Sequence, residues 1–333
     1  MHVTLKPISE QVIVITGASS GIGLATAQAA AAAGAKVVLT ARTESALAAA
    51  VEQIRAEGGT AVYAVADVAQ REELARVART AVDHFSRIDT WVNNAGVGIW
   101  STIEETSEQD MRRLFETNFW GQVHGSVVAL PYLRTSGGAL INVGSMVSDR
   151  ALPMQGIYSA SKQALKGFTD ALRMELAHEN APISVTLVKP GSIGTPMPQH
   201  VKNYTGHEAK FPAPVYAPED VAAVILHVAT HPTRDAFVGG SARMTAALAH
   251  VVPGMLDWLS QQFLVEAQLG PKPATPGDNL HHGRSEARVR GDHQGSMIRP
   301  SGYTHAKLHP GLLALGLGAA VLGLAAASQS ARS

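Results

Sequence analysis

The chain has 333 residues and a formal net charge of zero, so it is long enough for one large α/β domain with an extension, and it lacks the basic field that nucleic-acid partners favour. It contains no cysteine, which excludes disulfides, thiolate metal sites and cysteine nucleophiles. Its first residues, MHVTLKPISEQ, are too polar for a signal peptide, and we therefore expect a cytoplasmic protein.

Short β-branched runs alternate with helical segments over the first two-thirds of the chain. Such runs are typical of buried parallel strands, and we expect seven of them: QVIVITG, KVVLTAR, TAVYAVADV, IDTWVNNAG, GGALINVGS, PISVTLVKPG and DAFVGG. Helices are expected between them, and the one after the fifth strand spans about Gly156 to His178. This alternation predicts an α/β fold with an open parallel sheet that is covered by helices on both faces.

The turn between the first strand and the first helix reads VITGASSGIG. Glycines let the backbone approach a diphosphate closely, and the helix N-terminus supplies N–H groups and a positive dipole end. Gly17, Gly21 and Gly23 are spaced G-x-x-x-G-x-G, which is neither the G-x-G-x-x-G fingerprint nor a Walker A loop. The motif indicates a phosphate loop, and the alternative is an ordinary glycine-containing turn.

The end of the second strand bears on the choice of cofactor. An acidic residue there would bind a ribose 2′-hydroxyl and repel a 2′-phosphate, but the sequence has Ala41 followed by Arg42. Because arginine pairs with phosphate through parallel charge-assisted bonds, we expect NADP(H) rather than NAD(H). A solvated surface charge is the alternative interpretation of Arg42.

Three polar residues in the middle of the chain are candidates for one site. Ser145 follows the fifth strand, while Tyr158 and Lys162 are four residues apart and so face the same side of the following helix. The fourteen histidines are scattered, and we expect no metal site.

Taken in order, these motifs resemble the classical short-chain dehydrogenase/reductase family. The resemblance runs from about Gln11 to Gly240 and rests on TGASSGIG at Thr16–Gly23, ADV at Ala66–Val68, NNAG at Asn93–Gly96, Asn118, Ser145, YSASK at Tyr158–Lys162 and PGSIGT at Pro190–Thr195. It implies a Rossmann-type, doubly wound sheet of seven strands in the order 3-2-1-4-5-6-7, and a homo-oligomer.

The resemblance also implies roles for individual residues. Tyr158 would be the general acid or base, Lys162 would hold the nicotinamide ribose and lower the tyrosine pKa, Ser145 would bind the substrate oxygen, and Asn118 would hold a water that links Lys162 to solvent. The implied cofactor-binding residues are Gly17, Ser19, Ser20, Gly21, Ile22, Gly23, Arg42, Asp67, Val68, Asn94, Ala95, Gly96, Tyr158, Lys162, Pro190, Gly191, Ile193 and Thr195. Of these, Asp67 and Val68 would contact adenine, Asn94 would border the adenosine ribose, and Ile193 and Thr195 would fix the nicotinamide carboxamide.

Two later segments interrupt the pattern. The Pro-rich stretch from Gly194 to Ala217 follows the carboxyl end of a strand, where open α/β sheets bind ligands, and we expect it to be a lid. Beyond Gly240, where we expect the active site to be complete, the chain continues past the family's usual ending. We divide the chain into a catalytic domain (1–245), a helical extension (246–269), a disordered linker (270–308) and an apolar helix (309–328).

The apolar run at 311–327 carries no charge and would be about 25 Å long as a helix. This is slightly shorter than the ~30 Å hydrocarbon core of a bilayer. Two interpretations stay open: a membrane anchor that tethers a cytoplasmic domain, and a helix that docks on protein.

The sequence therefore predicts an NADP(H)-dependent oxidoreductase that interconverts a carbonyl and a secondary alcohol. Met154, Met197, Tyr204 and Phe211 hint at an apolar pocket for a small substrate. The alternatives are a non-catalytic NADP(H)-binding sensor or scaffold on the same fold, and an epimerase or dehydratase of the extended family.

Overall fold

A seven-stranded parallel sheet forms the centre of the computed structural model, which describes residues 3–274, 276–284, 287–293 and 295–308. Its strands are β1 (Val12–Thr16), β2 (Lys36–Ala41), β3 (Thr60–Val65), β4 (Thr90–Asn93), β6 (Gly138–Val143), β7 (Ile183–Pro190) and β12 (Asp235–Val238). They are ordered β12-β7-β6-β4-β1-β2-β3, and every pairing is parallel. The predicted doubly wound order is thereby confirmed.

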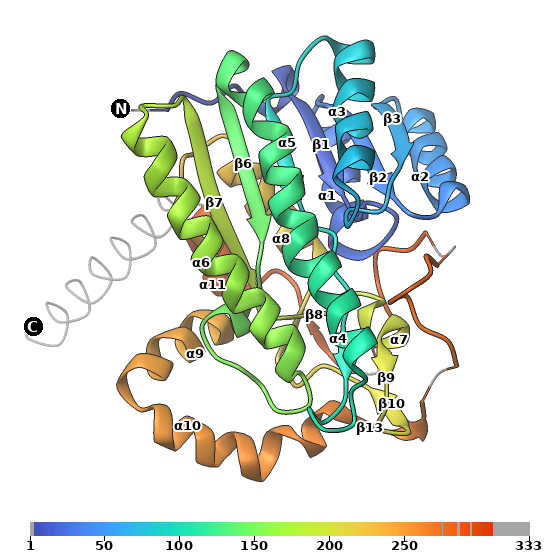
Figure 1. Cartoon of the computed structure of the whole chain (residues 1–333), viewed down its shortest axis with the longest axis vertical. Coiled ribbons are helices and arrows are strands. Elements are labelled where there is room, and N and C mark those ends of the chain that lie inside the picture. Colours follow the sequence, from blue (N-terminus) through green and yellow to red (C-terminus); the bar gives the residue numbers. More distant parts are fainter. Residues whose placement is uncertain (1–2, 275, 285–286, 294, 309–333) are drawn as a thin grey trace, which may run out of the picture.

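Helices cover both faces of this sheet (Figure 1). The larger ones are α1 (Gly21–Ala32), α2 (Glu44–Ala56), α3 (Arg71–Phe85), α4 (Glu108–Phe115), α5 (Gly121–Ser136), α6 (Gly156–His178) and α8 (Pro218–Val228). Alternate residues of β1 serve opposite faces: Ile13 and Ile15 pack with α1, α2 and α8, whereas Val14 packs with α3, α5 and α6. Burial on both sides is the reason that β1 is apolar at nearly every position.

The strand order reverses at β1, which pairs with β2 on one side and β4 on the other. The connections from the two halves of the sheet leave in opposite directions at this point, and a crevice opens at the carboxyl ends of the strands. The phosphate loop and the residues after β4 and β6 therefore meet at one edge of the sheet.

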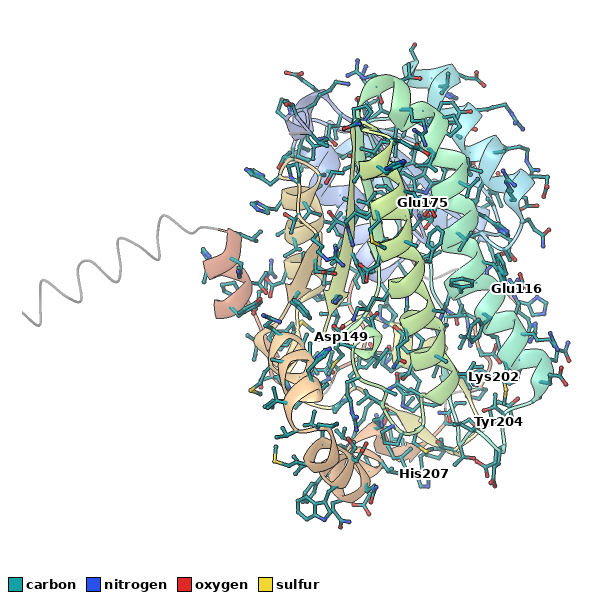
Figure 2. All side chains as sticks on the ribbon, turned by 60° about the vertical axis from the view of Figure 1, so that its left-hand side comes forward. Glu116, Asp149, Glu175, Lys202, Tyr204 and His207 are labelled. Atoms are coloured by element: carbon teal, nitrogen blue, oxygen red, sulfur yellow. The ribbon has the colours of Figure 1, made fainter. Side chains whose placement is uncertain are left out.

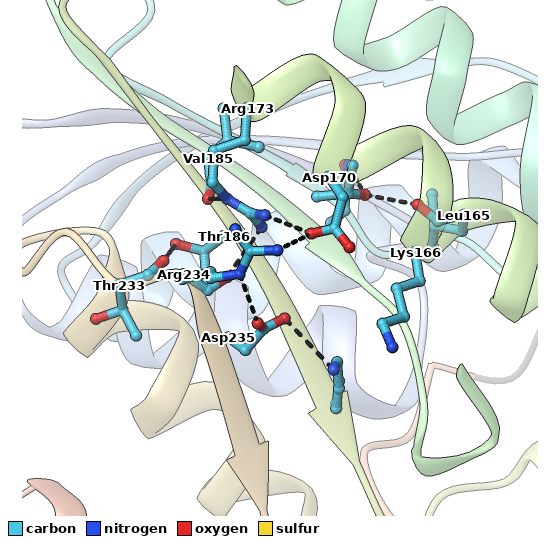
Figure 3. Close-up of polar contacts among 12 residues, drawn as sticks. Leu165, Lys166, Asp170, Arg173, Val185, Thr186, Thr233, Arg234 and Asp235 are labelled. Carbon is cyan, nitrogen blue, oxygen red and sulfur yellow. Dashed lines mark hydrogen bonds and ion pairs between the residues drawn. The ribbon is translucent and has the colours of Figure 1, made fainter. Parts of the chain in front are cut away.

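A polar cluster fixes α6 against the outer strands (Figure 3). The carboxylate of Asp170 accepts hydrogen bonds from Arg173, at 2.6 Å, and from Arg234, at 2.7 Å. Arg173 also donates to the carbonyl of Val185 in β7, at 2.9 Å. Because α6 carries Tyr158 and Lys162, these contacts hold the helix that presents them.

The expected lid, residues 194–217, has a defined path across the carboxyl edge. It contains α7 (Met197–His200), β9 (Lys202–Asn203), β10 (His207–Ala209) and β11 (Val215–Tyr216); β9 pairs with β5 (Ile99–Trp100), and β11 pairs with β8 (Ser192–Ile193). Tyr204, close to Lys202 in Figure 2, donates to the carboxylate of Asp110 in α4, at 2.6 Å.

The C-terminal part differs from the expectation. Helices α9 (Gly240–Val251) and α10 (Pro253–Leu259) are followed by a π-helical turn (Ser260–Leu264), a short 3-10 turn, β13 (Leu269–Pro273), β14 (Met297–Ile298) and α11 (Gly302–Leu308). β13 pairs with β10, and β14 with β11. The prediction of a disordered linker at 270–308 is therefore wrong for the described residues, because this polar segment is ordered by contacts with the catalytic domain and not by an apolar repeat of its own.

The apolar helix predicted at 309–328, and with it the membrane contact of residues 311–327, lies outside the described residues. Within the residues that the structure describes, no helix has the length and apolarity needed to cross a bilayer.

Candidate active site

A cavity opens at the carboxyl edge of the sheet, and it gathers nearly all of the residues singled out in the sequence. The predicted residues that line it are Gly17, Ser19, Ser20, Gly21, Ile22, Arg42, Asp67, Val68, Asn94, Ala95, Gly96, Ser145, Tyr158, Lys162, Pro190, Gly191, Ile193 and Thr195. Gly23 and Asn118 do not line it and lie behind its wall.

The phosphate loop is held by its own backbone and by Asn94. Gly17 has a φ of +66°, in the left-handed region that favours glycine. The Asn94 amide donates to the carbonyls of Thr16 and Gly17, at 2.9 and 3.2 Å. A Cβ on Gly23 would lie 2.2 Å from the carbonyl oxygen of Gly17, so Gly23 allows α1 to pack against the turn.

The far end of the cavity is cationic. Arg42 follows β2, is half-buried, and donates to the carbonyl of Leu280 at 3.2 Å and to that of Asn279. Asp67, after β3, accepts from Arg113 at 2.5 Å. Burial lowers the pKa of Arg42, while the nearby charge of Asp67 acts to raise it. Arg42 is thus not the solvated surface charge of the alternative interpretation.

Ser145, Tyr158 and Lys162 come together at the opposite end. Ser145 stands two residues past β6, and its side chain is near enough to Tyr158 to act on the pKa of that phenol. Lys162, 3% exposed, donates to the carbonyl of Val143 at 2.8 Å, and its Nζ lies 5.8 Å from the centre of the Tyr158 ring. The predicted convergence is therefore present in the structure.

Burial dominates the pKa shifts of Tyr158 and Lys162 in this structure. Burial raises the pKa of Tyr158 to about 12, against a smaller lowering by the hydrogen bond with Ser145. Burial lowers the pKa of Lys162 to about 7. The expected lowering of the tyrosine pKa is absent because both groups are desolvated and the ammonium is directed at Val143 rather than at the phenol.

Asn118 lies in a π-helical turn, Glu116–Trp120, between α4 and α5. Its side chain is fully buried, accepts from the Val97 N–H at 2.8 Å and donates to the Val97 carbonyl at 2.9 Å. A Cβ on Gly96 would lie 3.5 Å from Asn118 Oδ1 and 3.8 Å from Lys162 Nζ. Asn118 therefore clamps the segment between β4 and β5, next to Lys162. Single-turn π-helices recur at functional sites.

One part of the cavity wall is apolar. It includes Met146, Val147, Leu152, Met197 and Phe211. The expected Met154 and Tyr204 do not line the cavity, because Tyr204 turns to Asp110 on α4 and Met154 precedes α6 in a left-handed conformation with a φ of 64°.

Several lining residues were missed in the sequence. They are Gln155, His200, Asn279, Gly283 and Arg284, among others. The last three show that the site is not complete by Gly240. The stretch that carries them has no periodicity or motif, so no local signal could have placed it here. Within the described residues no group of three or more His, Asp or Glu side chains could hold a metal ion.

Comparison with known proteins identifies relatives that have the same fold. The sequence model of the short chain dehydrogenase family matches residues 11–205. An uncharacterized oxidoreductase of Bacillus subtilis, YxnA, is 42% identical over 311 residues, which cover 92% of this chain and 87% of that protein. An 11-beta-hydroxysteroid dehydrogenase A of Arachis hypogaea is 40% identical over 188 residues, covering 56% of this chain and 53% of that protein.

Solved structures are also similar. A short-chain dehydrogenase/reductase of Burkholderia phymatum in complex with NAD has a TM-score of 0.67 and 25% identity, covering 77% of this chain and 97% of that chain. An alcohol dehydrogenase of Thermococcus sibiricus complexed with 5-hydroxy-NADP has a TM-score of 0.59 and 28% identity, covering 68% and 94%. With the sheet order, the phosphate loop and the Ser-Tyr-Lys arrangement in place, these matches show that the chain belongs to the short-chain dehydrogenase/reductase family of oxidoreductases.

Proposed function

We propose that the protein is an NADP(H)-dependent oxidoreductase that interconverts a carbonyl group and a secondary alcohol, with Ser145, Tyr158 and Lys162 as its catalytic residues. The observation that carries this proposal is the convergence of Ser145 and Tyr158, one helical turn from Lys162, in the cavity that also contains the phosphate loop.

The residues that line the cavity are suited to binding a dinucleotide. The turn at Gly17 has room for no side chain, since a Cβ there would lie 2.7 Å from Ala95 Cα, and it leads into the N-terminus of α1. Ser19 to Ile22 would hold the diphosphate, Asp67 and Val68 the adenine, and Ile193 and Thr195 the carboxamide. When bound, the nicotinamide supplies or accepts the hydride.

The choice of NADP(H) rests on Ala41 and Arg42. One structural relative is in complex with NAD and another with 5-hydroxy-NADP, so the family accommodates both types of dinucleotide. In this chain no carboxylate stands at Ala41, and the guanidinium of Arg42 lines the cavity. A 2′-phosphate would find a cation there and no competing charge at position 41.

The proton chemistry belongs to Tyr158. A hydroxyl whose pKa is about 12 stays protonated at neutral pH and can donate to a carbonyl oxygen as that oxygen gains charge. The Ser145 hydroxyl donates to the same oxygen and stabilises its developing charge. Burial lowers the pKa of Lys162 to about 7, so this lysine changes charge near neutrality.

The wall of Met146, Val147, Leu152, Met197 and Phe211 supports a small apolar substrate. The test is a screen for NADPH oxidation over simple ketones, quinones, ketosteroids and retinoids, with NADH in parallel and a Tyr158→Phe variant as the blank. Turnover that depends on Tyr158 is expected with at least one class. A chain that binds NADPH yet turns over no carbonyl or alcohol would favour the sensor or scaffold instead.

Two further properties are part of the proposal. A homo-oligomer is supported by the exposed hydrophobic side chains of Trp120, Val127 and Met174 on or beside the long helices α5 and α6, and light scattering after size exclusion tests it.

Membrane contact through residues 311–327 is supported by the uncharged sequence alone. Fractionation of cells expressing the full chain, with a carbonate wash, tests it; recovery wholly in the soluble fraction contradicts it.

A further inference from the structure

We define a C-terminal strap as residues 276–284 and 287–293, whose backbone is part of the orange-red trace in Figure 1. Its residues Asn279, Gly283 and Arg284 line the cavity together with Arg42. The Arg42 guanidinium donates to three of its carbonyls, those of Asn279, Leu280 at 3.2 Å and His282 at 3.4 Å. Arg113, the partner of Asp67, donates to the Leu280 carbonyl as well, at 3.1 Å. Both arginines at the cationic end of the cavity, Arg42 and Arg113, thus donate to main-chain oxygens of the same short stretch.

Further contacts anchor the strap. Leu280 is fully buried in a cluster with Val97, Ile99 and Leu114. His281 Nε2 lies 2.7 Å from Asp110 Oδ1, and the Asn279 N–H donates to the His200 carbonyl at 2.8 Å. At its other end, the Gly21 N–H donates to the Arg288 carbonyl at 3.0 Å. A buried leucine and main-chain hydrogen bonds at both ends therefore hold the strap against the catalytic domain.

The strap lines the cavity beside Arg42, and its Arg288 carbonyl accepts from the Gly21 N–H of the phosphate loop, a bond that a bound diphosphate would replace. Asn279, Gly283 and Arg284 line the same cavity as Arg42 and Ser145. Three bonds also leave the Arg42 guanidinium with unused N–H groups, because it carries five donors in a rigid fork. Held in this way, the side chain needs little further ordering when an anion arrives, and preorganisation of this kind raises affinity.

We propose that the strap is part of the cofactor site and that its carbonyls position Arg42 for the 2′-phosphate, so that the strap sets the preference for NADP(H) over NAD(H). The proposal rests on the proposed function, since it assumes that the cavity binds a dinucleotide. Residues 279–282 are positioning residues: they act through Arg42 and on the one group that distinguishes the two cofactors.

The test compares full-length variants in their dissociation constants for NADPH and NADH. Leu280→Asp places a charge in a buried apolar cluster and releases the strap, whereas Leu280→Met keeps the volume and the apolar character. Gly302→Ala is the matched control, because a Cβ at this C-terminal position meets nothing within 4 Å. Gly283→Ala is a second, uncharged way to displace the strap, since its Cβ would lie 2.2 Å from Thr43 Oγ1.

We expect Leu280→Asp and Gly283→Ala to raise the Kd for NADPH about tenfold, as for loss of one charged hydrogen bond, and to leave the Kd for NADH within about twofold. Leu280→Met and Gly302→Ala should match the wild type. In an Arg42→Ala background, Leu280→Asp should add nothing, because both changes remove the same interaction.

Equal weakening of both cofactors would overturn the proposal, because it would indicate general destabilisation or a simple cover. Unchanged constants, or additive effects in the double variant, would overturn it as well. A wild-type chain that binds neither dinucleotide would instead refute the proposed function, and that outcome is distinguished by the wild-type titrations alone.

Discussion

Lys162 donates its buried ammonium to the carbonyl of Val143, the last residue of β6, at 2.8 Å. This bond ties α6 to the strand that delivers Ser145 two residues later. Tyr158, Ser145 and Lys162 are therefore held by one helix–strand contact.

Tyr158→Phe should abolish most turnover while leaving cofactor binding and fold intact. Loss of a positioned general acid lowers kcat by roughly 10²–10⁴-fold. The measurement is kcat on any substrate found in the screen, together with an NADPH titration. Tyr63→Phe is the control, because the Tyr63 hydroxyl donates to Glu44 and does not line the cavity. Retained kcat in Tyr158→Phe would contradict the assignment.

Alcohol oxidation should depend on pH, whereas carbonyl reduction should keep its proton donor throughout the neutral range. Because the pKa of Tyr158 is raised to about 12, its proton is present through neutrality, and reduction has its donor there. Oxidation needs the phenolate, whose share grows as the pH rises toward that value. We expect kcat/KM for alcohol oxidation to rise across pH 7–9, measured in buffers of constant ionic strength. An oxidation rate that falls over this range would be inconsistent with Tyr158 as the base.

Arg42→Ala combined with Ala41→Asp should reverse the cofactor preference. In the wild type we expect NADPH to bind more tightly than NADH by roughly 1.5–3 kcal/mol, as for hydrogen bonds to charged groups. The double variant exchanges a phosphate-binding cation for a carboxylate that binds a ribose hydroxyl. Titration calorimetry measures both constants, and Arg71→Ala, an exposed arginine at the start of α3, is the control. Equal wild-type affinities would show that Arg42 does not recognise the phosphate.

Two glycine-to-alanine changes should alter stability in opposite directions. Gly23→Ala would bring a Cβ to 2.2 Å from the Gly17 carbonyl oxygen, and we expect a loss of about 1–3 kcal/mol in the free energy of unfolding, with weaker NADPH binding. Gly167→Ala, inside α6 with nothing within 4 Å, should add about 0.5–1 kcal/mol. Urea unfolding measures both. A neutral Gly23→Ala would contradict the close packing of α1 on the phosphate loop.

Asp149→Asn should destabilise the protein in a pH-dependent manner. Burial acts to raise the pKa of Asp149, but the hydrogen bonds from Lys166 and Lys189 outweigh it and lower that pKa. A folded-state pKa below the unfolded value gives stability that is present above the ordinary carboxyl pKa and is lost as pH falls through the folded value.

The expected loss for Asp149→Asn is about 3 kcal/mol at neutral pH, because Lys189, 3% exposed, loses a buried partner. The difference from the wild type should shrink as the pH approaches 3. Asp257→Asn, which breaks an exposed pair with Arg150, is the control and should change stability little. A loss that does not depend on pH would argue against the ionised Asp149.

Much of the fold and of the site could be predicted from the sequence because the signals are local. The strands of a doubly wound sheet are buried on both faces, so β1 is apolar along its length and easily recognised. The phosphate loop needs glycine at Gly17 for its left-handed turn, and the four-residue spacing of Tyr158 and Lys162 places both on one side of α6. These are properties of single elements, which a sequence carries within a few residues.

Contacts between segments that are distant in the sequence were decided only by the tertiary structure. Asn118 clamps Val97, Tyr204 turns away from the cavity to Asp110, and Arg42 faces carbonyls more than two hundred residues further along the chain. The strap has no periodicity because its order comes from main-chain carbonyls and one buried leucine that meet partners elsewhere in the domain. Main-chain oxygens are the same in every residue, so the partners that they find cannot be predicted from the local sequence and depend on how the whole chain is folded.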